Sequence, residues 1–217
     1  MGGFSFVELL VSMAIMLSVM GSMFGIINAA RGVFETDLER ADMQQRARIS
    51  ADVLIKDLVM AGAGSLAPAV APFRRGAINP DTPGSAFPDR ISVLYAPSDP
   101  ADGASVTLTY ALRPDAAGIP QIARYDGIST DLPVVDQISG LRFEYFDGAG
   151  QGIPLARFVD GPWSPNAVVP DRFDADLLAI RRVRMMLRVR PARTLVGIPL
   201  AELEVCIDVS PRNLNLQ

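Results

Sequence analysis

The chain has 217 residues, about half of them apolar, and its 20 basic and 24 acidic side chains give a net charge of −4. This length accommodates one domain with an anchor or at most two small domains, and the acidic balance argues against a nucleic-acid surface. Histidine is absent and Cys206 is the single cysteine. The sequence therefore offers no histidine base or ligand, no intrachain disulfide and no cysteine metal cluster.

An uncharged stretch lies near the start of the chain. The 22 residues from Leu9 to Ala30 carry no charge. At about 1.5 Å per residue they form roughly 33 Å of helix, enough to cross a hydrocarbon core of about 30 Å. Glu8 directly precedes this stretch. A carboxylate entering a bilayer costs about 2.5–3.5 kcal/mol, so Glu8 needs a partner, either within its own chain or on another chain.

This region also has two ordinary explanations. Ser5 and Glu8 have the spacing of a capping box, which would satisfy free N–H groups at the helix start and is compatible with any function. A secretory signal peptide would have an apolar region of roughly 7–15 residues, preceded by basic residues and followed by a small-residue cleavage site. Residues 1–30 match none of these three features, so a signal peptide is not favoured.

Residues 3–11, with the sequence G-F-S-F-V-E-L-L-V, resemble the class III signal of type IV pilins and type II secretion pseudopilins. The usual family form is Gly followed by F-T-L-I-E-L-L-V. The resemblance implies that a prepilin peptidase removes residues 1–3 by cutting between Gly3 and Phe4, and then methylates the new amine of Phe4. It also implies that Glu8 attracts the N-terminal amine of a neighbouring subunit. Family leaders carry Lys or Arg, which residues 1–3 lack.

The helical pattern continues beyond the apolar stretch. Proline is absent from the first 67 residues, and Gly62 and Gly64 provide a stop signal. We therefore expect a helix over residues 4–62, transmembrane over about 9–30. One apolar stripe at spacings of three and four comprises Met43, Ala47, Ala51, Leu54, Leu58 and Ala61. Three apolar residues nearly opposite this stripe are Ile49, Val53 and Met60. Two apolar faces suggest two partners, the chain's own head and neighbouring helices, although burial on both sides within one domain would produce the same pattern.

Residues 65–217 are expected to form a β-rich periplasmic or extracellular head. Residues 65–90 are rich in Pro, Gly and Ala, which indicates a long irregular connection. Alternating apolar residues then predict strands at 91–95, 106–112, 121–125 and 141–145. Turn residues separate them at 113–118 and 147–152. The second of these turns lacks the Lys of a phosphate-binding loop and the several acids of a calcium loop.

The last two expected strands carry complementary charges. Apolar positions alternate with a mostly arginine face in residues 182–190 and with a mostly acidic face in residues 202–209. An antiparallel hairpin would make the charge pairs Arg190–Glu202, Arg188–Glu204 and Arg184–Asp208. A shift by one residue would place each Arg against an apolar residue, so the register is well specified. Because the acidic strand neutralises the arginines, a nucleic-acid role for them is not favoured.

These elements together predict an α+β, pilin-like fold, in which a long N-terminal helix packs on a C-terminal antiparallel β-sheet. Residues 48–62 (R-I-S-A-D-V-L-I-K-D-L-V-M-A-G) resemble the R-x-x-x-D-x-L-x-x-D-L-R-x-A-G region of PilW-type minor pilins, with Val59 where Arg is usual. The order of the later strands is similar to that of PilW-type minor pilins and J-type pseudopilins.

The resemblance implies a non-enzymatic assembly subunit. It would be a minor pilin of a type IV pilus, acting in filament initiation or at the tip, or a J-type minor pseudopilin of a type II secretion system. Expected partners are other minor pilins, the major pilin, prepilin peptidase and the inner membrane, with a periplasmic head that later joins a pilus or pseudopilus. A signal-anchored periplasmic binding domain that never assembles would have the same helix. No Ser/His/Asp set, metal-ligand cluster or convincing carboxylate pair occurs, so we expect no catalysis, cofactor, metal, nucleic acid or small-molecule substrate.

Overall fold

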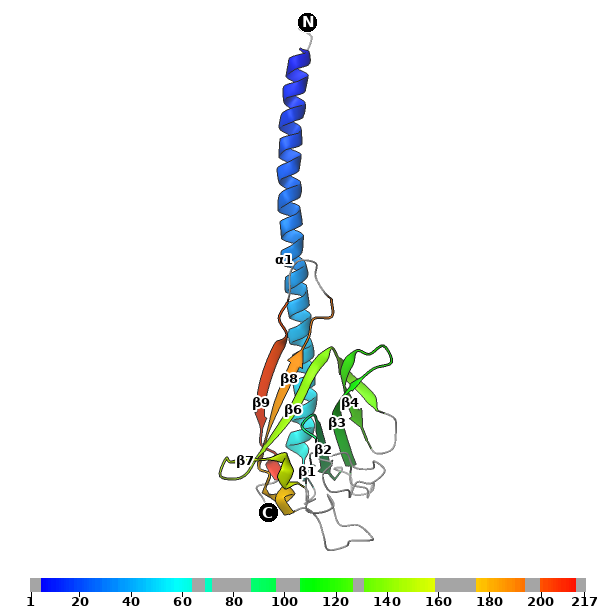
Figure 1. The fold of residues 1–217 in the computed structure, drawn as a ribbon, viewed down its shortest axis with the longest axis vertical. Coiled ribbons are helices and arrows are strands. Elements are labelled where there is room, and N and C mark those ends of the chain that lie inside the picture. Colours follow the sequence, from blue (N-terminus) through cyan, green and yellow to red (C-terminus); the bar gives the residue numbers. More distant parts are fainter. Residues whose placement is uncertain are drawn as a thin grey trace. The chain divides into compact units, whose positions relative to one another are not determined.

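The structure is a computed structural model, and it describes residues 5–63, 69–71, 87–96, 106–126, 131–158, 175–193 and 200–213. The chain divides into two compact units. Residues 1–42 and 193–200 make up the first unit, and residues 43–192 and 201–217 make up the second. One long helix, α1 (Phe6–Met60), contributes to both units (Figure 1).

The predicted long helix is present. α1 has 55 residues without a proline and is rich in Ala, Leu and Met, which are strong helix formers. It ends at Met60, and Gly62 follows with a φ of +76°. The backbone N–H of Gly62 donates to the Leu94 carbonyl at 2.8 Å. A left-handed residue after the last turn favours glycine because a Cβ would be strained there.

In the first unit, α1 is exposed along most of its length. Every residue from 5 to 29 is exposed, whereas Thr36 and Glu39 are buried. A Glu39 carboxylate oxygen accepts a hydrogen bond from the backbone N–H of Arg193 at 3.1 Å. Arg193, shortly after strand β8 (Arg182–Val189), therefore contacts α1 within this unit.

The second unit contains two antiparallel sheets (Figure 1). The five-stranded sheet has the order β1-β2-β3-β4-β5, with strands Val70–Ala71, Arg90–Tyr95, Val106–Pro114, Pro120–Tyr125 and Leu132–Asp136. The four-stranded sheet has the order β7-β6-β8-β9, with β6 at Ile138–Phe146, β7 at Gly152–Ile153, β8 at Arg182–Val189 and β9 at Leu203–Val209. Two short 3-10 helices are η2 (Leu155–Arg157) and η3 (Ala175–Ala179). The α+β prediction is confirmed, with the expected strands divided between two sheets.

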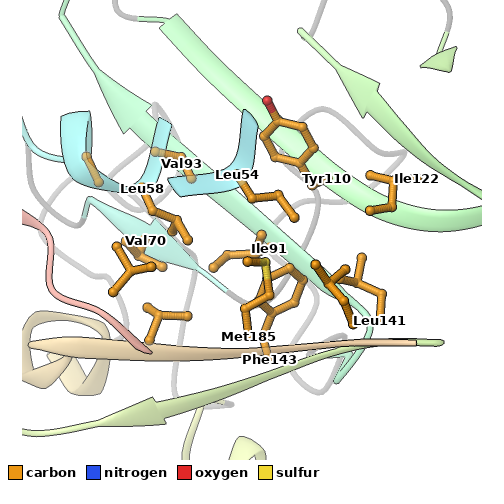
Figure 2. Packing of buried hydrophobic residues seen from close by; sticks show 14 of the residues in the cluster. Leu54, Leu58, Val70, Ile91, Val93, Tyr110, Ile122, Leu141, Phe143 and Met185 are labelled. Atoms are coloured by element: carbon orange, nitrogen blue, oxygen red, sulfur yellow. The ribbon is translucent and has the colours of Figure 1, made fainter. Parts of the chain in front are cut away.

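The core of the second unit is built from α1 and both sheets. The six residues of the predicted helix stripe are all buried, at 7% exposure or less. Leu54 and Leu58 face the interior together with Ile91 and Tyr110 of the first sheet and Met185 of the second (Figure 2). On the opposite helix face, Ile49 and Met60 are exposed, whereas Val53 is partly buried and packs against the core. The 3.6-residue periodicity thus identified the buried side of the helix correctly.

Two hairpin turns share one geometry. Asp115 lies between β3 and β4, and its Oδ1 accepts the backbone N–H groups of Ala117 and Ile119 at 2.8 and 2.7 Å. Asp147 accepts equivalent bonds in the turn between β6 and β7, at 2.9 and 2.8 Å. Each turn has a glycine with φ near +80° three residues after its aspartate. These are Asx-type turns, as the sequence predicts at 113–118 and 147–152.

The chain passes from the first sheet to the second at Gln137. This residue separates β5 from β6, is buried, and has a φ of +59°. Its carbonyl accepts the backbone N–H of Arg190 at 3.0 Å, and its Oε1 accepts the Arg190 Nε–H at 2.7 Å. Side-chain and backbone bonds to one arginine therefore hold the connection between the sheets.

Candidate functional site

The N-terminal part of α1 presents a continuous apolar surface. Between Phe6 and Ile27 its large apolar side chains are at least 41% exposed. α1 contains a segment long and apolar enough to cross a membrane, and no part of it is buried among the residues that the structure describes. A helix that is apolar on all sides needs an apolar environment, which is a bilayer or a bundle of other helices.

The serines of this segment do not interrupt its apolar character. The hydroxyls of Ser12, Ser18 and Ser22 donate to the backbone carbonyls of Glu8, Ala14 and Val19 at 2.7, 2.9 and 2.8 Å. Each hydroxyl proton is therefore satisfied within the helix. Such internal bonding is what an environment without water requires.

Glu8 differs from these serines. Its side chain is exposed in the first turn of α1. Among the residues that the structure describes, its carboxylate has no hydrogen bond and no ion pair. From Phe6 to Ile27 it is the only polar side chain not satisfied within the described part of the chain. A charge placed in an apolar environment requires a partner, and the described residues of this chain provide none.

The two other residues expected at the N-terminus, Gly3 and Phe4, lie outside the described residues. The first turn itself is closed by the backbone. The N–H groups of Glu8 and Leu9 donate to the Ser5 carbonyl at 3.0 and 3.2 Å. Within the described residues, the side-chain bonds of the expected capping box between Ser5 and Glu8 are not formed.

The β8–β9 hairpin has the register that its charge pattern predicts. Arg184 is opposite Asp208, Arg188 is opposite Glu204, and the apolar residues pair on the other face, from Val183 with Val209 to Val189 with Leu203. The four residues of β8 on this apolar face, Val183, Met185, Leu187 and Val189, are fully buried. The predicted register is confirmed for the paired residues, and their alternation accounts for it, because an odd shift would bury arginines.

Arg184 and Asp208 form the best-aligned ion pair of this hairpin. The Arg184 guanidinium makes two bonds to the Asp208 carboxylate, at 2.7 and 3.0 Å. The hydrogen bond from Arg184 lowers the pKa of the Asp208 carboxyl below its ordinary value, and the same bond raises the pKa of Arg184. Arg182 approaches the same carboxylate at 3.8 Å. Both Arg182 and Arg184 also lie over the Phe146 ring, with the Cζ atoms 4.5 and 5.0 Å from its centroid.

The expected pair between Arg190 and Glu202 is replaced by other contacts. The paired part of the hairpin ends at Val189 and Leu203, and Arg190 instead binds Gln137. Glu202 lies 3.6 Å from Arg188, which is also 3.6 Å from Glu204. That prediction is wrong because Gln137, in the connection between the sheets, takes the Arg190 side chain away from the hairpin.

One buried polar contact was not anticipated. Asp57 of α1, 8% exposed, accepts a hydrogen bond from the hydroxyl of Tyr110 on β3. Burial, followed by this hydrogen bond, raises the pKa of Tyr110 well above its ordinary value. Asp57 lies between Leu54 and Leu58 in sequence, so its position beside the buried stripe was an available signal. Its partner depends on the packing of a distant strand.

No model of a known protein family matches this chain, and no curated protein matches it. The functional interpretation therefore rests on the residues and their geometry.

Proposed function

We propose that this chain is an assembly subunit of a filament of the type IV pilin class, a minor pilin incorporated through its N-terminal helix. The observation that carries the proposal is the Glu8 carboxylate, which has no partner among the described residues and stands at the start of an otherwise self-satisfied apolar helix. In this proposal, the subunit is held in the inner membrane by residues 9–30, with a periplasmic head, and then moves into a bundle of similar helices.

The N-terminal amine of a neighbouring subunit provides the positive charge that pairs with the Glu8 carboxylate. An ammonium and a carboxylate attract each other strongly where water is excluded, and an acid left there without this partner is strongly destabilising. The amine is supplied by Phe4 after cleavage between Gly3 and Phe4. Because each subunit offers one carboxylate and one amine, the same contact repeats from subunit to subunit and sets their axial spacing.

A second feature supports assembly through α1. Beyond the uncharged segment, from Arg31 onwards, the helix still exposes large apolar side chains, with Val33, Phe34 and Leu38 at 61%, 74% and 67%. Further along, Ile49 and Met60 are exposed at 42% and 39%. An anchor that never assembles would gain nothing from apolar residues in water. Packing against neighbouring helices would cover them.

The test is the substitution Glu8→Gln, which keeps the size of the side chain and removes its charge. Filaments are sheared from cells that produce the variant, and the amount of this chain in the filament fraction is measured against its amount in the membrane. We expect incorporation to fall at least tenfold with the membrane amount unchanged. Mass spectrometry of the same material should find a methylated Phe4 at the N-terminus.

A matched control is Glu35→Gln, which removes an exposed acid from the same helix outside the uncharged segment. This variant should be incorporated like the wild type. If Glu8→Gln entered filaments as efficiently as Glu35→Gln, the assembly proposal would be rejected. An intact N-terminus with residues 1–3 still attached would instead favour a membrane-anchored domain that does not assemble.

A further inference from the structure

Strand β9 forms the free edge of the four-stranded sheet. Among the strands that the structure describes, it is the last in the order β7-β6-β8-β9 and pairs only with β8 (Figure 1). Within the described residues, no backbone group on its other side has a hydrogen-bond partner. A free edge of this kind presents a row of N–H and C=O groups that a further strand can pair with.

The other edges of the two sheets are less suited to pairing. β1 and β7 have two residues each. β5 contains Pro133, which lacks an N–H, and its pairing with β4 is shifted between Ile122 and Ala123. β9 has seven residues in unbroken register and contains neither proline nor lysine. It therefore lacks the short length, the proline and the register shift that make the other edges unsuited to pairing.

The apolar face of β9 is incompletely covered. Leu203, Val205 and Ile207 pack against the core but stay partly exposed. Their neighbours on β8, including Met185 and Leu187, are fully buried. Side chains on neighbouring strands of a sheet partly cover one another. An additional strand beside β9 would therefore bury these apolar side chains further.

The polar face of β9 has an excess of negative charge at one end. Glu202 and Glu204 both lie 3.6 Å from Arg188 and share its single charge, and their side chains are 43% and 60% exposed. Arg190, which could have neutralised Glu202, is bound to Gln137. Two carboxylates therefore depend on one guanidinium next to the free edge.

From these observations we propose that the edge of β9 accepts a strand from another polypeptide. The strand carries apolar side chains on one face and Lys or Arg at alternate positions on the other. Its basic residues meet Glu202 and Glu204, and its apolar residues cover Leu203, Val205 and Ile207. The binding mode is addition of a strand to a sheet, in which backbone bonds provide affinity and side chains provide selectivity. This surface is distinct from α1 and from Glu8.

The same charges disfavour a second copy of this chain as the occupant. An antiparallel β9–β9 contact centred on Cys206 would place Glu204 opposite the second copy's Asp208, and the reverse. Like charges directly opposite each other are destabilising. Self-pairing in this register is therefore disfavoured, and the exposed thiol of Cys206 would report such a contact as a disulfide-linked dimer.

Binding is tested with the full chain in a non-ionic detergent and a fluorescent peptide of nine residues that alternates Arg and Val. We expect it to bind, and a peptide with Glu in place of Arg not to bind. A peptide with the same composition but grouped Arg and Val should bind much more weakly. Glu202→Gln and Glu204→Gln should each weaken binding by about two- to fivefold, the range for an exposed cross-strand charge pair. Glu144→Gln is the matched control, because Glu144 lies on β6 in the same sheet, away from this edge.

The orientation of the strand is tested through Cys206. The alternating peptide receives an activated disulfide either at its central polar position or at the adjacent apolar position. Only the peptide with the activated disulfide at its central polar position should label Cys206 efficiently. Any one of four results would overturn the proposal. Two concern the peptides: equal labelling of Cys206 by both activated peptides, or binding of the grouped peptide as tight as that of the alternating one. Two concern the chain: a loss of binding in Glu144→Gln as large as in Glu202→Gln or Glu204→Gln, or disulfide-linked dimers. None of these measurements needs a filament, so the result is independent of the test on Glu8.

Discussion

The hydroxyl of Tyr110 on β3 donates a hydrogen bond to the carboxylate of Asp57 on α1 in the interior of the second unit. Tyr110 is fully buried and Asp57 is 8% exposed. A polar bond therefore joins the helix to the five-stranded sheet among apolar contacts that have no directional preference. Buried polar pairs of this kind can select one orientation among several packings of similar energy.

Replacing Tyr110 by Phe should destabilise the second unit. The substitution preserves the ring but leaves the buried Asp57 carboxylate without its hydroxyl donor. Loss of a hydrogen bond to a charged group costs about 1.5–3 kcal/mol. Urea unfolding of the full chain in detergent, followed by near-ultraviolet circular dichroism, measures this loss. Asp57→Asn combined with Tyr110→Phe should cost clearly less than the sum of the two single changes, and additive costs would contradict the direct pairing.

Stability should decrease in alkaline solution. Burial raises the pKa of both Tyr110 and Tyr145 far above the ordinary value of 10.0. Above that value the unfolded chain loses these protons while the folded chain keeps them. The free energy of unfolding should therefore fall as pH rises beyond 10.0, by about 1.4 kcal/mol per pH unit for each tyrosine. Urea midpoints at a series of pH values test this, and Tyr145→Phe should have the shallower dependence.

The two apolar faces of α1 should respond differently to truncation. Leu58 is fully buried, and Leu58→Ala should lower the free energy of unfolding by about 2–5 kcal/mol because it leaves a cavity. Ile49 lies on the opposite face and is 42% exposed, so Ile49→Ala should change stability by less than about 1 kcal/mol. If that face packs on neighbouring subunits, Ile49→Ala should nevertheless reduce recovery in sheared filaments. A large loss of stability in Ile49→Ala would show that this face is buried within one chain.

The Arg184–Asp208 pair should contribute little to stability, and its contribution should depend on pH and salt. Both groups are at the surface, where exposed ion pairs are weak and screened. Because Arg184 lowers the pKa of Asp208 below the ordinary 3.8, its stabilisation is present above that pH. It is lost as pH falls through the folded-state pKa. Asp208→Asn should therefore melt slightly below the wild type at neutral pH, with the difference vanishing in acid. A difference that persisted in acid would contradict this origin.

Much of the fold follows from local patterns. Alternation along 182–189 and 203–209 predicts both strands, an odd shift of their register would bury arginines, and the charge pairs select the register among the even shifts. The helix stripe from Met43 to Ala61 is buried as its spacing predicts. The alternation of apolar and polar residues is a weaker guide to a strand when both faces of that strand are buried. In β2 the four residues from Ile91 to Leu94 are all buried, including Ser92, whose hydroxyl hydrogen-bonds to Thr109.

The parts that sequence reasoning missed depend on contacts between distant segments. The sequence pairs Arg190 with Glu202, but Gln137 lies 53 positions away along the chain and competes successfully for that arginine. The partner of Asp57 is likewise 53 positions away. The short strands β1 and β7 have two residues each, too few to show a period. No local pattern reports on such pairings.

The amino-acid sequence by itself determined the long proline-free helix and its apolar N-terminal half with a single acid at the start. It also determined the β8–β9 hairpin, whose two strands carry complementary charges. Each of these depends on a periodicity that one segment carries alone. Tertiary structure alone decided that the strands divide into two sheets at Gln137, that β9 stands at an open edge, and that two glutamates there share one arginine. Those features depend on which distant groups compete for the same partner, and this competition is resolved only when the chain is folded.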